Sequence, residues 1–158
     1  MHFDKVGFIG LGLIGGSIAR KMKENNPKVS IIATAGHQQT IEDAFGLGLI
    51  DNNELLELNS FKDCDVIFLC APVNKNIEYL TQLKDIIKDD CIITDVGSTK
   101  TQIHEKVIEL ALSAILSAVI RWRVLRRPVF LMLQRRFWKM LTILSHRPQR
   151  VLPLLWKN

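Results

Sequence analysis

Residues 5–17, with the sequence Lys-Val-Gly-Phe-Ile-Gly-Leu-Gly-Leu-Ile-Gly-Gly-Ser, decide the fold of this chain. The run Lys5–Gly10 is short and apolar, ends in glycines, and has the length expected of a buried parallel strand. Ile14 to Glu24 predicts a helix, and the sequence Asn25-Asn26-Pro27 would end it. The strand therefore leads through a glycine-rich turn directly into a helix.

Strands and helices alternate along the rest of the first 113 residues. Further strands are predicted at Val29–Ala33, Asp65–Ala71 and Cys91–Asp95, with a weak edge strand near Leu55–Leu58. Further helices are predicted at Gln39–Phe45, along a face of Ile77, Leu80, Leu83 and Ile87, and along a face of Ile103, Val107 and Leu110. This alternation predicts an α/β fold, a Rossmann-like, doubly wound parallel sheet.

The glycines between the first strand and the first helix form a Gly-x-Gly-x-x-Gly motif. The first glycine would permit a tight turn, the second would let the backbone approach a pyrophosphate, and the third would let the helix pack closely on the sheet. The helix N-terminus would then face the phosphates with unpaired N–H groups and a partial positive charge. The alternative is a glycine turn needed only for packing. The motif predicts a dinucleotide-binding loop made of Gly10, Leu11, Gly12, Leu13, Ile14 and Gly15.

The residue that usually selects between NAD and NADP lies about 20 residues after the motif, where an Asp or Glu binds the ribose 2′-OH of NAD. Here that position falls on Ala35, and no Arg or Lys stands nearby to bind a 2′-phosphate. Thr34 and His37 are candidate ribose contacts, although a solvated loop histidine is the simpler interpretation of His37. NAD is the predicted cofactor, and NADP stays open.

Charge divides the chain into two unlike segments. The 158 residues carry a net charge of +5, yet residues 1–113 hold 11 Lys and Arg against all 16 Asp and Glu. Residues 114–158 hold 10 Lys and Arg, no acidic residue, no glycine and all three tryptophans, Trp122, Trp138 and Trp156. We therefore predict a dinucleotide-binding domain over 1–113 and a separate basic tail over 114–158; that the first domain is incomplete is implied only by the family resemblance given below.

Composition excludes several other classes of protein. A hydrophobic content of 47% argues for a globular domain and against a disordered or collagen-like chain. Cys64, Cys70 and Cys91 lie in apolar runs without a Cys-x-x-Cys pair, which predicts a reducing, cytoplasmic location and no metal site. Met1 is followed by a strand and not by a signal peptide, and no apolar run is long enough to span a membrane.

Three motifs, in this order, carry a resemblance to a known family. They are Val6–Ser17, Asp65–Val73 (Asp-Val-Ile-Phe-Leu-Cys-Ala-Pro-Val) and Asp95–Lys100 (Asp-Val-Gly-Ser-Thr-Lys). Together they resemble the nucleotide-binding half of prephenate dehydrogenase, including its arogenate-using relatives, over about residues 5–113. The resemblance implies NAD(P)-dependent oxidative decarboxylation of prephenate to 4-hydroxyphenylpyruvate, a step of tyrosine biosynthesis. It also implies a homodimer in the intact family.

The resemblance further implies roles for individual residues. The glycine motif would hold the pyrophosphate, and Ala71 and Pro72 would line the cofactor site at the carboxyl end of their strand. Ser98 would lie beside the nicotinamide and the ring hydroxyl of the substrate, and its spacing equally suits the N-cap of a helix.

The catalytic histidine of the family does not stand where the resemblance places it. Family members carry it in a Gly-Gly-His-Pro-Met/Ile-Ala-Gly motif, on the strand after the helix that follows Ser98, where it accepts the proton or hydrogen bond of the substrate hydroxyl. This chain has no such motif. His104 lies on the preceding helix and is interpreted as a surface residue, and His2 and His146 match nothing.

The codons that the tail allows contain the missing motif in another reading frame. If each shifted codon takes the last base of one codon and the first two of the next, Leu116–Phe130 permit Ile-Gly-Gly-His-Pro-Met-Ala-Gly-Ser-Glu-Lys-Thr-Gly-Phe. In the same frame Phe137–Lys139 force Leu-Glu, the next residues permit Asn-Ala-Tyr-Tyr, and Leu144–Pro148 permit Leu-Thr-Pro-Thr, similar to a further family segment. We therefore predict a frame slip near Leu112–Ile115 and a truncated, inactive chain that lacks the histidine motif and the family's helical domain.

Two alternatives remain for the function. One is a module that binds NAD without chemistry. The other is a functional basic tail, because Arg and Trp interleave at Arg121–Arg123 and Arg135–Lys139 as in segments that bind anionic membranes or nucleic acid. The preferred prediction has prephenate or arogenate as the small-molecule partner of the intact family, with no nucleic acid, no membrane and no homodimer of this chain.

Overall fold

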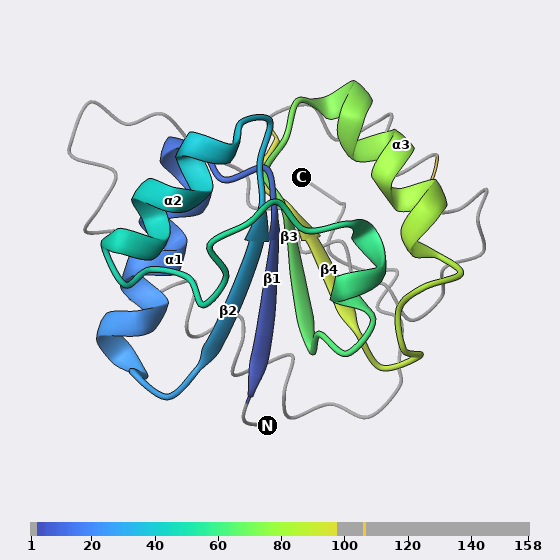
Figure 1. Ribbon diagram of the computed structural model, residues 1–158. Helices are drawn as coiled ribbons and strands as arrows, with labels where there is room; N and C mark the ends of the chain where they lie inside the picture. Colours follow the sequence, from blue (N-terminus) through green and yellow to red (C-terminus); the bar gives the residue numbers. More distant parts are fainter. Residues whose placement is uncertain (1–2, 98–105, 107–158) are drawn as a thin grey trace, which may run out of the picture. The chain divides into compact units, whose positions relative to one another are not determined.

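Four parallel strands form one sheet in the computed structural model, which describes residues 3–97 and residue 106 (Figure 1). The strands run in the order β2-β1-β3-β4, and every neighbouring pair is parallel. Their bounds are β1 Lys5–Ile9, β2 Ser30–Thr34, β3 Val66–Leu69 and β4 Ile92–Asp95. The predicted α/β class and parallel sheet are therefore confirmed.

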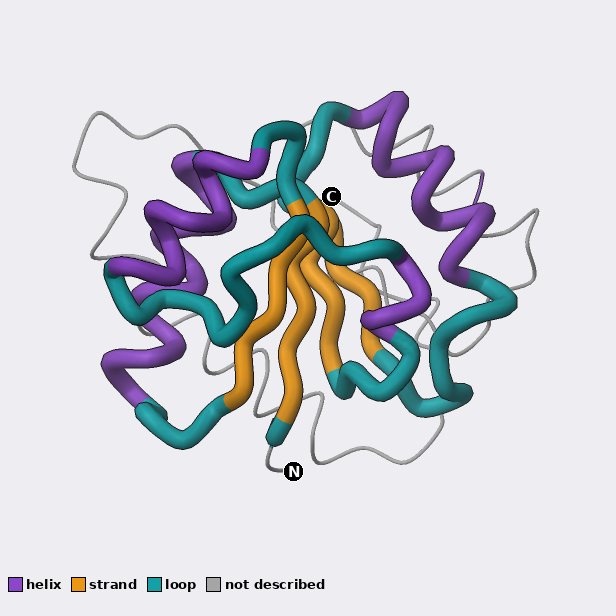
Figure 2. The backbone as a smooth tube through the Cα atoms, in the orientation of Figure 1, coloured by secondary structure: helices purple, strands orange, loops and turns teal. Residues whose placement is uncertain are grey.

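Helices cover the sheet on both sides, with α1 and α2 on one side and α3 on the other (Figures 1 and 2). Their bounds are α1 Leu13–Asn25, α2 Gln38–Gly46 and α3 Val73–Leu83, with a short 3-10 helix, η1, at Leu58–Phe61. These positions agree with the predicted helices to within one or two residues where a range was given. The helix predicted from Ile103, Val107 and Leu110 lies outside the described residues, apart from Lys106, which is helical. No helix in the described part is long and apolar enough to cross a membrane.

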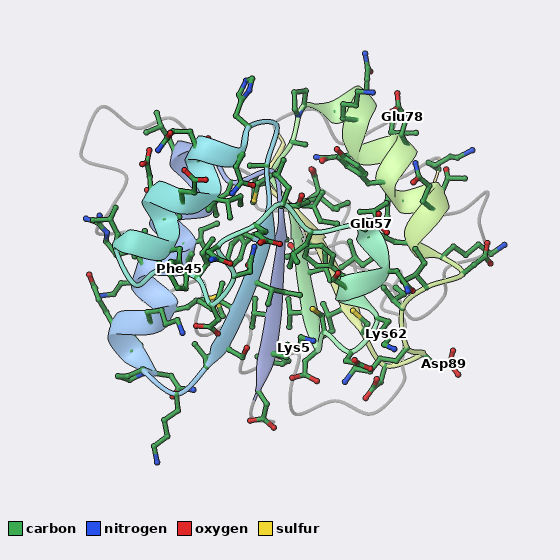
Figure 3. All side chains as sticks on the ribbon, in the orientation of Figure 1. Lys5, Phe45, Glu57, Lys62, Glu78 and Asp89 are labelled. Carbon is green, nitrogen blue, oxygen red and sulfur yellow. The ribbon has the colours of Figure 1, made fainter. Side chains whose placement is uncertain are left out.

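The alternation of side chains along the strands builds two apolar layers, because successive residues point to opposite faces of a sheet. On one face Ile9 and Ile67 join a buried cluster with Phe61 of η1 and Leu80 of α3. On β1 and β3 the Phe8 and Phe68 rings stack with their centroids 4.8 Å apart. Charged side chains such as Glu78 and Asp89 are exposed and point away from these layers (Figure 3).

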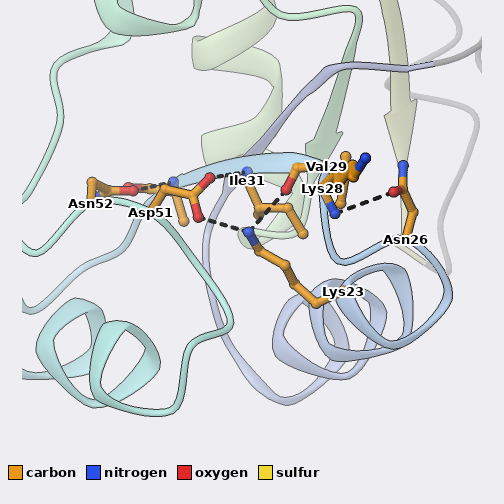
Figure 4. A network of polar contacts seen from close by, with 8 residues as sticks. Lys23, Asn26, Lys28, Val29, Ile31, Asp51 and Asn52 are labelled. Atoms are coloured by element: carbon orange, nitrogen blue, oxygen red, sulfur yellow. Dashed lines mark hydrogen bonds and ion pairs between the residues drawn. The ribbon is translucent and has the colours of Figure 1, made fainter.

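One predicted strand is wrong, because Leu55–Leu58 form no strand and Leu58 instead begins η1. The outer edge of β2 is closed by two side chains (Figure 4). Asp51 Oδ2 accepts the Ile31 N–H at 2.8 Å, and the Asp51 N–H donates to the Ile31 carbonyl at 2.7 Å. Asn52 repeats this at Ala33, where Oδ1 accepts the N–H at 2.8 Å and Nδ2 donates to the carbonyl at 2.9 Å. Because these backbone groups are already paired, the edge needs no further strand.

The amino ends of the strands are tied together by one carboxylate. Asp65 Oδ2 accepts the N–H groups of Asp4 and Lys5 at 2.7 and 3.0 Å, and Oδ1 accepts a hydrogen bond from Lys88 Nζ at 2.6 Å. Burial alone would raise the pKa of Asp65, but the Lys88 and backbone hydrogen bonds outweigh it and lower the pKa below its ordinary value. The pKa of Asp51 is lowered for the same reasons, with Lys23 and the Ile31 N–H as the donors.

We expect the stability of the protein to fall with pH below about 4, where the carboxylates of the unfolded chain begin to bind protons. Because the folded pKa of Asp65 lies below its unfolded pKa, its contribution is present at neutral pH and is lost as the pH falls through the folded value. Asp65→Asn should lower the free energy of unfolding at pH 7 by about 1 to 2 kcal/mol, since an amide cannot accept all three donors. Urea unfolding followed by circular dichroism at pH 7 and pH 3 checks this. A difference between variant and wild type that is equal at both pH values would contradict it.

Candidate functional site

The strand order creates a topological switch point at the carboxyl ends of β1 and β3. From β1 the chain crosses through α1 to β2 on one side, and from β3 it crosses through α3 to β4 on the other. Ligands of open parallel sheets bind outside the carboxyl ends of the strands at such a point. The glycine loop that follows β1 and the segment that follows β3 both lie there.

Gly10 occupies the closest approach between these two segments. It adopts φ = +90°, in the left-handed region that favours glycine. A Cβ on Gly10 would lie 2.5 Å from the Ala71 nitrogen and 2.8 Å from the Ala71 Cα. Its N–H donates to the Thr34 carbonyl at 2.9 Å. The turn at Gly10 therefore joins the ends of β1, β2 and β3, and no side chain fits between them.

The other two glycines of the motif differ in what surrounds them. A Cβ on Gly15 would lie 3.0 Å from the Gly10 carbonyl oxygen and 3.4 Å from Cys70 Sγ, so this glycine lets α1 pack closely against the sheet. A Cβ on Gly12 would meet nothing within 4 Å. Packing within the described residues thus accounts for Gly10 and Gly15 but not for Gly12, where a side chain would project into open space.

The N-terminus of α1 adjoins that open space. Gly12 is the N-cap residue, no side chain caps the helix, and the first turn holds no acidic residue. The first helical hydrogen bond runs from the Gly16 N–H to the Gly12 carbonyl at 2.8 Å, so the preceding N–H groups have no partner in the helix itself. Beside them Leu13 is 93% exposed. Free N–H groups and the positive end of the helix dipole together suit an anion such as a pyrophosphate.

The segment after β3 supplies the opposite wall. Cys70 donates its N–H to the Ile9 carbonyl at 2.7 Å, Ala71 lies against Gly10, and Pro72 is the N-cap residue of α3. Burial, with a smaller effect of the Asp95 carboxylate, raises the pKa of the Cys70 thiol to about 12. The thiol therefore stays protonated at neutral pH and cannot act as a thiolate nucleophile.

Two buried polar residues lie beneath this edge: the sequence analysis named Asp95 only as part of a strand and a family motif, and it missed Asn76. Asn76 of α3 is fully buried and Asp95 at the end of β4 is 2% exposed, and Asn76 Nδ2 donates to Asp95 Oδ1 at 2.9 Å. One signal was available, because Asn76 falls on the same helical face as Val73, Leu80 and Leu83, which is otherwise apolar.

The structure brings together most of the residues predicted for the site. The glycine loop, Ala71 and Pro72 all lie at the switch point, with Leu11 buried beneath it. Ala35 and His37 follow the end of β2, and His37 is exposed as the N-cap of α2. Ser98 lies outside the described residues, so its role stays a prediction.

These features define the class of protein. A parallel sheet with a switch point, a positive-φ glycine turn after β1 and an uncapped helix N-terminus beside open space form a Rossmann-type dinucleotide-binding domain.

The particular family follows from the match of residues 18–118 to the family model described as prephenate dehydrogenase, nucleotide-binding domain. This chain belongs to the prephenate dehydrogenase family, whose members are oxidoreductases, through that domain. The resemblance inferred from the three motifs is therefore confirmed. The match ends at residue 118, a few residues after the predicted start of the basic tail at residue 114.

Similar proteins of known name include enzymes for two related substrates. Prephenate dehydrogenase of Lactococcus lactis subsp. cremoris is 36% identical over 108 residues, which cover 67% of this chain and 30% of that protein. Arogenate dehydrogenase of Synechocystis is 32% identical with a TM-score of 0.60, over 67% of this chain and 37% of that one. The Aquifex aeolicus prephenate dehydrogenase complex with hydroxyphenyl propionate and NAD+ shares the fold, with 24% identity and a TM-score of 0.65 over 73% and 41%. This chain thus spans about a third of the length of the curated relatives that it matches.

Alanine substitutions should separate the two kinds of glycine in the motif. Gly10→Ala should lower the free energy of unfolding by at least about 2 kcal/mol, because of its positive φ and its contact with the Ala71 backbone. Gly12→Ala should change it by less than about 1 kcal/mol, since the weaker N-cap and the stiffer unfolded chain act in opposite directions. Urea unfolding of both variants beside the wild type measures the difference. Equal destabilisation by the two substitutions would contradict this account of the loop.

Proposed function

We propose that this chain provides the NAD-binding part of an oxidoreductase that converts prephenate or arogenate by oxidative decarboxylation. The observation that carries the proposal is the combination at Gly12: an uncapped helix N-terminus and open space for a ligand, facing the end of β3. The family to which the chain belongs supports the same reaction class. Because the chain spans about a third of its relatives, the reaction of the whole enzyme is part of the proposal.

The residues present fit a dinucleotide. The N–H groups at the start of α1 would bind the pyrophosphate, and the absence of a Cβ at Gly12 would let the backbone approach it. Ala71 and Pro72 would contact the nicotinamide half, and Thr34, Ala35 and His37 lie on the side of the adenosine ribose. When bound, NAD supplies the hydride acceptor of the reaction.

The choice between NAD and NADP follows from the end of β2. No carboxylate follows Thr34, so nothing there repels a 2′-phosphate, and no Lys or Arg stands there to bind one. NAD is proposed as the cofactor because its 2′-OH needs no cationic partner. Prephenate and arogenate both remain within the proposal, since the relatives include enzymes named for each.

The proposal extends to the location and assembly of the protein. The three cysteines are free thiols, which suits a reducing cytoplasm. A homodimer is proposed for the intact enzyme and not for this chain.

We further propose that the residues after about 113 are translated out of frame. The support is that Leu116–Phe130 and Phe137–Pro148 permit two family segments in one shifted frame and in the correct order. As written, these residues hold no Gly-Gly-His-Pro motif and therefore no histidine in the position that would accept the proton of the substrate hydroxyl. The chain itself is then expected to bind NAD without turning over substrate.

NADH binding tests the first proposal. The full chain should bind NADH, and Gly12→Ala should weaken binding by about tenfold, because its Cβ would occupy the space that the pyrophosphate needs. Gly46→Ala is a matched control, since Gly46 ends α2 and a Cβ there also meets nothing within 4 Å. Fluorescence titration of NADH measures all three proteins. No binding by the wild type, or equal binding by all three, would refute the proposed site.

The nucleotide sequence from codon 105 onward tests the frame proposal. It should spell Gly-Gly-His-Pro-Met-Ala-Gly in the shifted frame in two independent clones. A gene with the frame restored should then form NADH from prephenate or arogenate, whereas the present chain should form none at any concentration. Synonymous codons that interrupt the shifted frame would show that the basic tail is genuine sequence.

A further inference from the structure

The Asn76 amide links three elements at the carboxyl edge of the sheet. Asn76 belongs to the first turns of α3, and its Nδ2 donates to Asp95 Oδ1 at 2.9 Å and to the Leu69 carbonyl at 3.4 Å. Leu69 ends β3 and Asp95 ends β4. A single buried side chain therefore holds the start of α3 to the ends of both strands on this side of the switch point.

Two further contacts hold the residues that follow β4, Val96 and Gly97. The Leu69 carbonyl also accepts the Val96 N–H at 3.2 Å. A Cβ on Gly97 would lie 3.2 Å from both carboxylate oxygens of Asp95, so the carboxylate lies directly against the Gly97 backbone. A movement of the Asp95 carboxylate would therefore displace the Gly97 backbone.

The orientation of the amide leaves one buried acceptor without a partner. Asn76 Oδ1 has no hydrogen-bond partner within the described residues, although Asn76 is fully buried. The reversed amide would point Oδ1 at two acceptors, Leu69 O and Asp95 Oδ1, so the observed orientation is the favourable one. A leucine at this position would carry no unpaired oxygen of its own, but it would remove the donor that Asn76 supplies to Asp95 Oδ1, and Asp95 is only 2% exposed. The amide at this position therefore serves the Asp95 carboxylate, although its own Oδ1 is left without a partner within the described residues.

The position of Asn76 and Asp95 in the sheet indicates which half of a dinucleotide they would affect. In a doubly wound sheet the unit β1-α1-β2 binds the adenosine half of a dinucleotide, and the strands beyond the switch point receive the other half. Asn76 and Asp95 lie on the β3-β4 side. On the basis of the proposed function, we propose that Asn76 is a positioning residue, which acts through Asp95 to hold Val96 and Gly97 where the nicotinamide half of the cofactor would bind.

A comparison of two ligands tests this role in the full chain. NADH and ADP-ribose share the adenosine, the pyrophosphate and the second ribose, and only NADH carries the nicotinamide ring. Asn76→Leu should weaken NADH binding by about tenfold, because Val96 and Gly97 would no longer be held in place for the nicotinamide ring, and should change ADP-ribose binding by less than about twofold. Asn76→Thr keeps a hydroxyl donor and should fall between wild type and Asn76→Leu. If Asn76→Leu does not fold, the comparison of NADH with ADP-ribose is made with Asn76→Thr alone. Isothermal titration calorimetry measures both ligands.

Asp65→Asn is the control for loss of stability, because Asp65 ties the amino ends of the strands, at the opposite edge of the sheet. It should leave the ratio of NADH to ADP-ribose affinity unchanged. If the Asn76 variants weaken both ligands equally, or neither, Asn76 is merely structural and the inference is wrong. If the wild type binds both ligands and the Asn76 variants have the same ratio of NADH to ADP-ribose affinity as the wild type, the inference fails while the proposed function stands. Failure of the wild type to bind either ligand overturns the proposed function and this inference together.

Discussion

The rest of the structure depends on the contact between Gly10 and the backbone of Ala71. A Cβ at Gly10 would lie 2.5 Å from the Ala71 nitrogen, so the ends of β1 and β3 can meet only if residue 10 has no side chain. This approach lets β1 pair with β3 on one side while the Gly10 N–H bonds Thr34 of β2 on the other. The helix that follows must then begin at the switch point, with its N-terminus at the carboxyl edge of the sheet. One steric constraint thus sets how β1, β2 and β3 meet and where α1 begins.

The two ends of the sheet have opposite chemistry as a consequence. At the amino edge the carboxylate of Asp65 satisfies backbone N–H groups and pairs with Lys88, and along the outer edge of β2 Asp51 and Asn52 do the same for Ile31 and Ala33. At the carboxyl edge the start of α1 has no side-chain cap. Side chains therefore pair the backbone groups at the amino edge and at the outer edge of β2. At the carboxyl edge the N–H groups at the start of α1 have no side-chain cap, which suits an anionic ligand.

Local sequence signals predicted most of the fold, and long-range pairings account for what they missed. The apolar runs of β1, β3 and β4 and the glycine motif are local, so the strands and the turn at Gly10 could be placed without a structure. The leucines at 55–58 suggested an edge strand, but the edge was already closed by side chains about twenty residues from their partners, which no periodicity encodes. The bond between Asn76 and Asp95 spans a similar separation, and only the polar residue on an apolar helix face marked it. The sequence also placed Ala35 after the end of β2, where an acidic residue usually binds the ribose of NAD. The choice between NAD and NADP depends on contacts with the ribose, which the protein fold alone does not contain.

The composition of the tail gains meaning from how the first domain is built. Acidic side chains fasten its strands at Asp51, Asp65 and Asp95, and glycines with positive φ make its turns at Gly10 and Gly48. Residues 114–158 contain no Asp, no Glu and no Gly, so none of these devices is available to them. The segment that the shifted frame permits between Leu116 and Arg126 would contain three glycines and a glutamate. The composition of residues 114–158 and the codon argument therefore both support the proposal that these residues are translated out of frame.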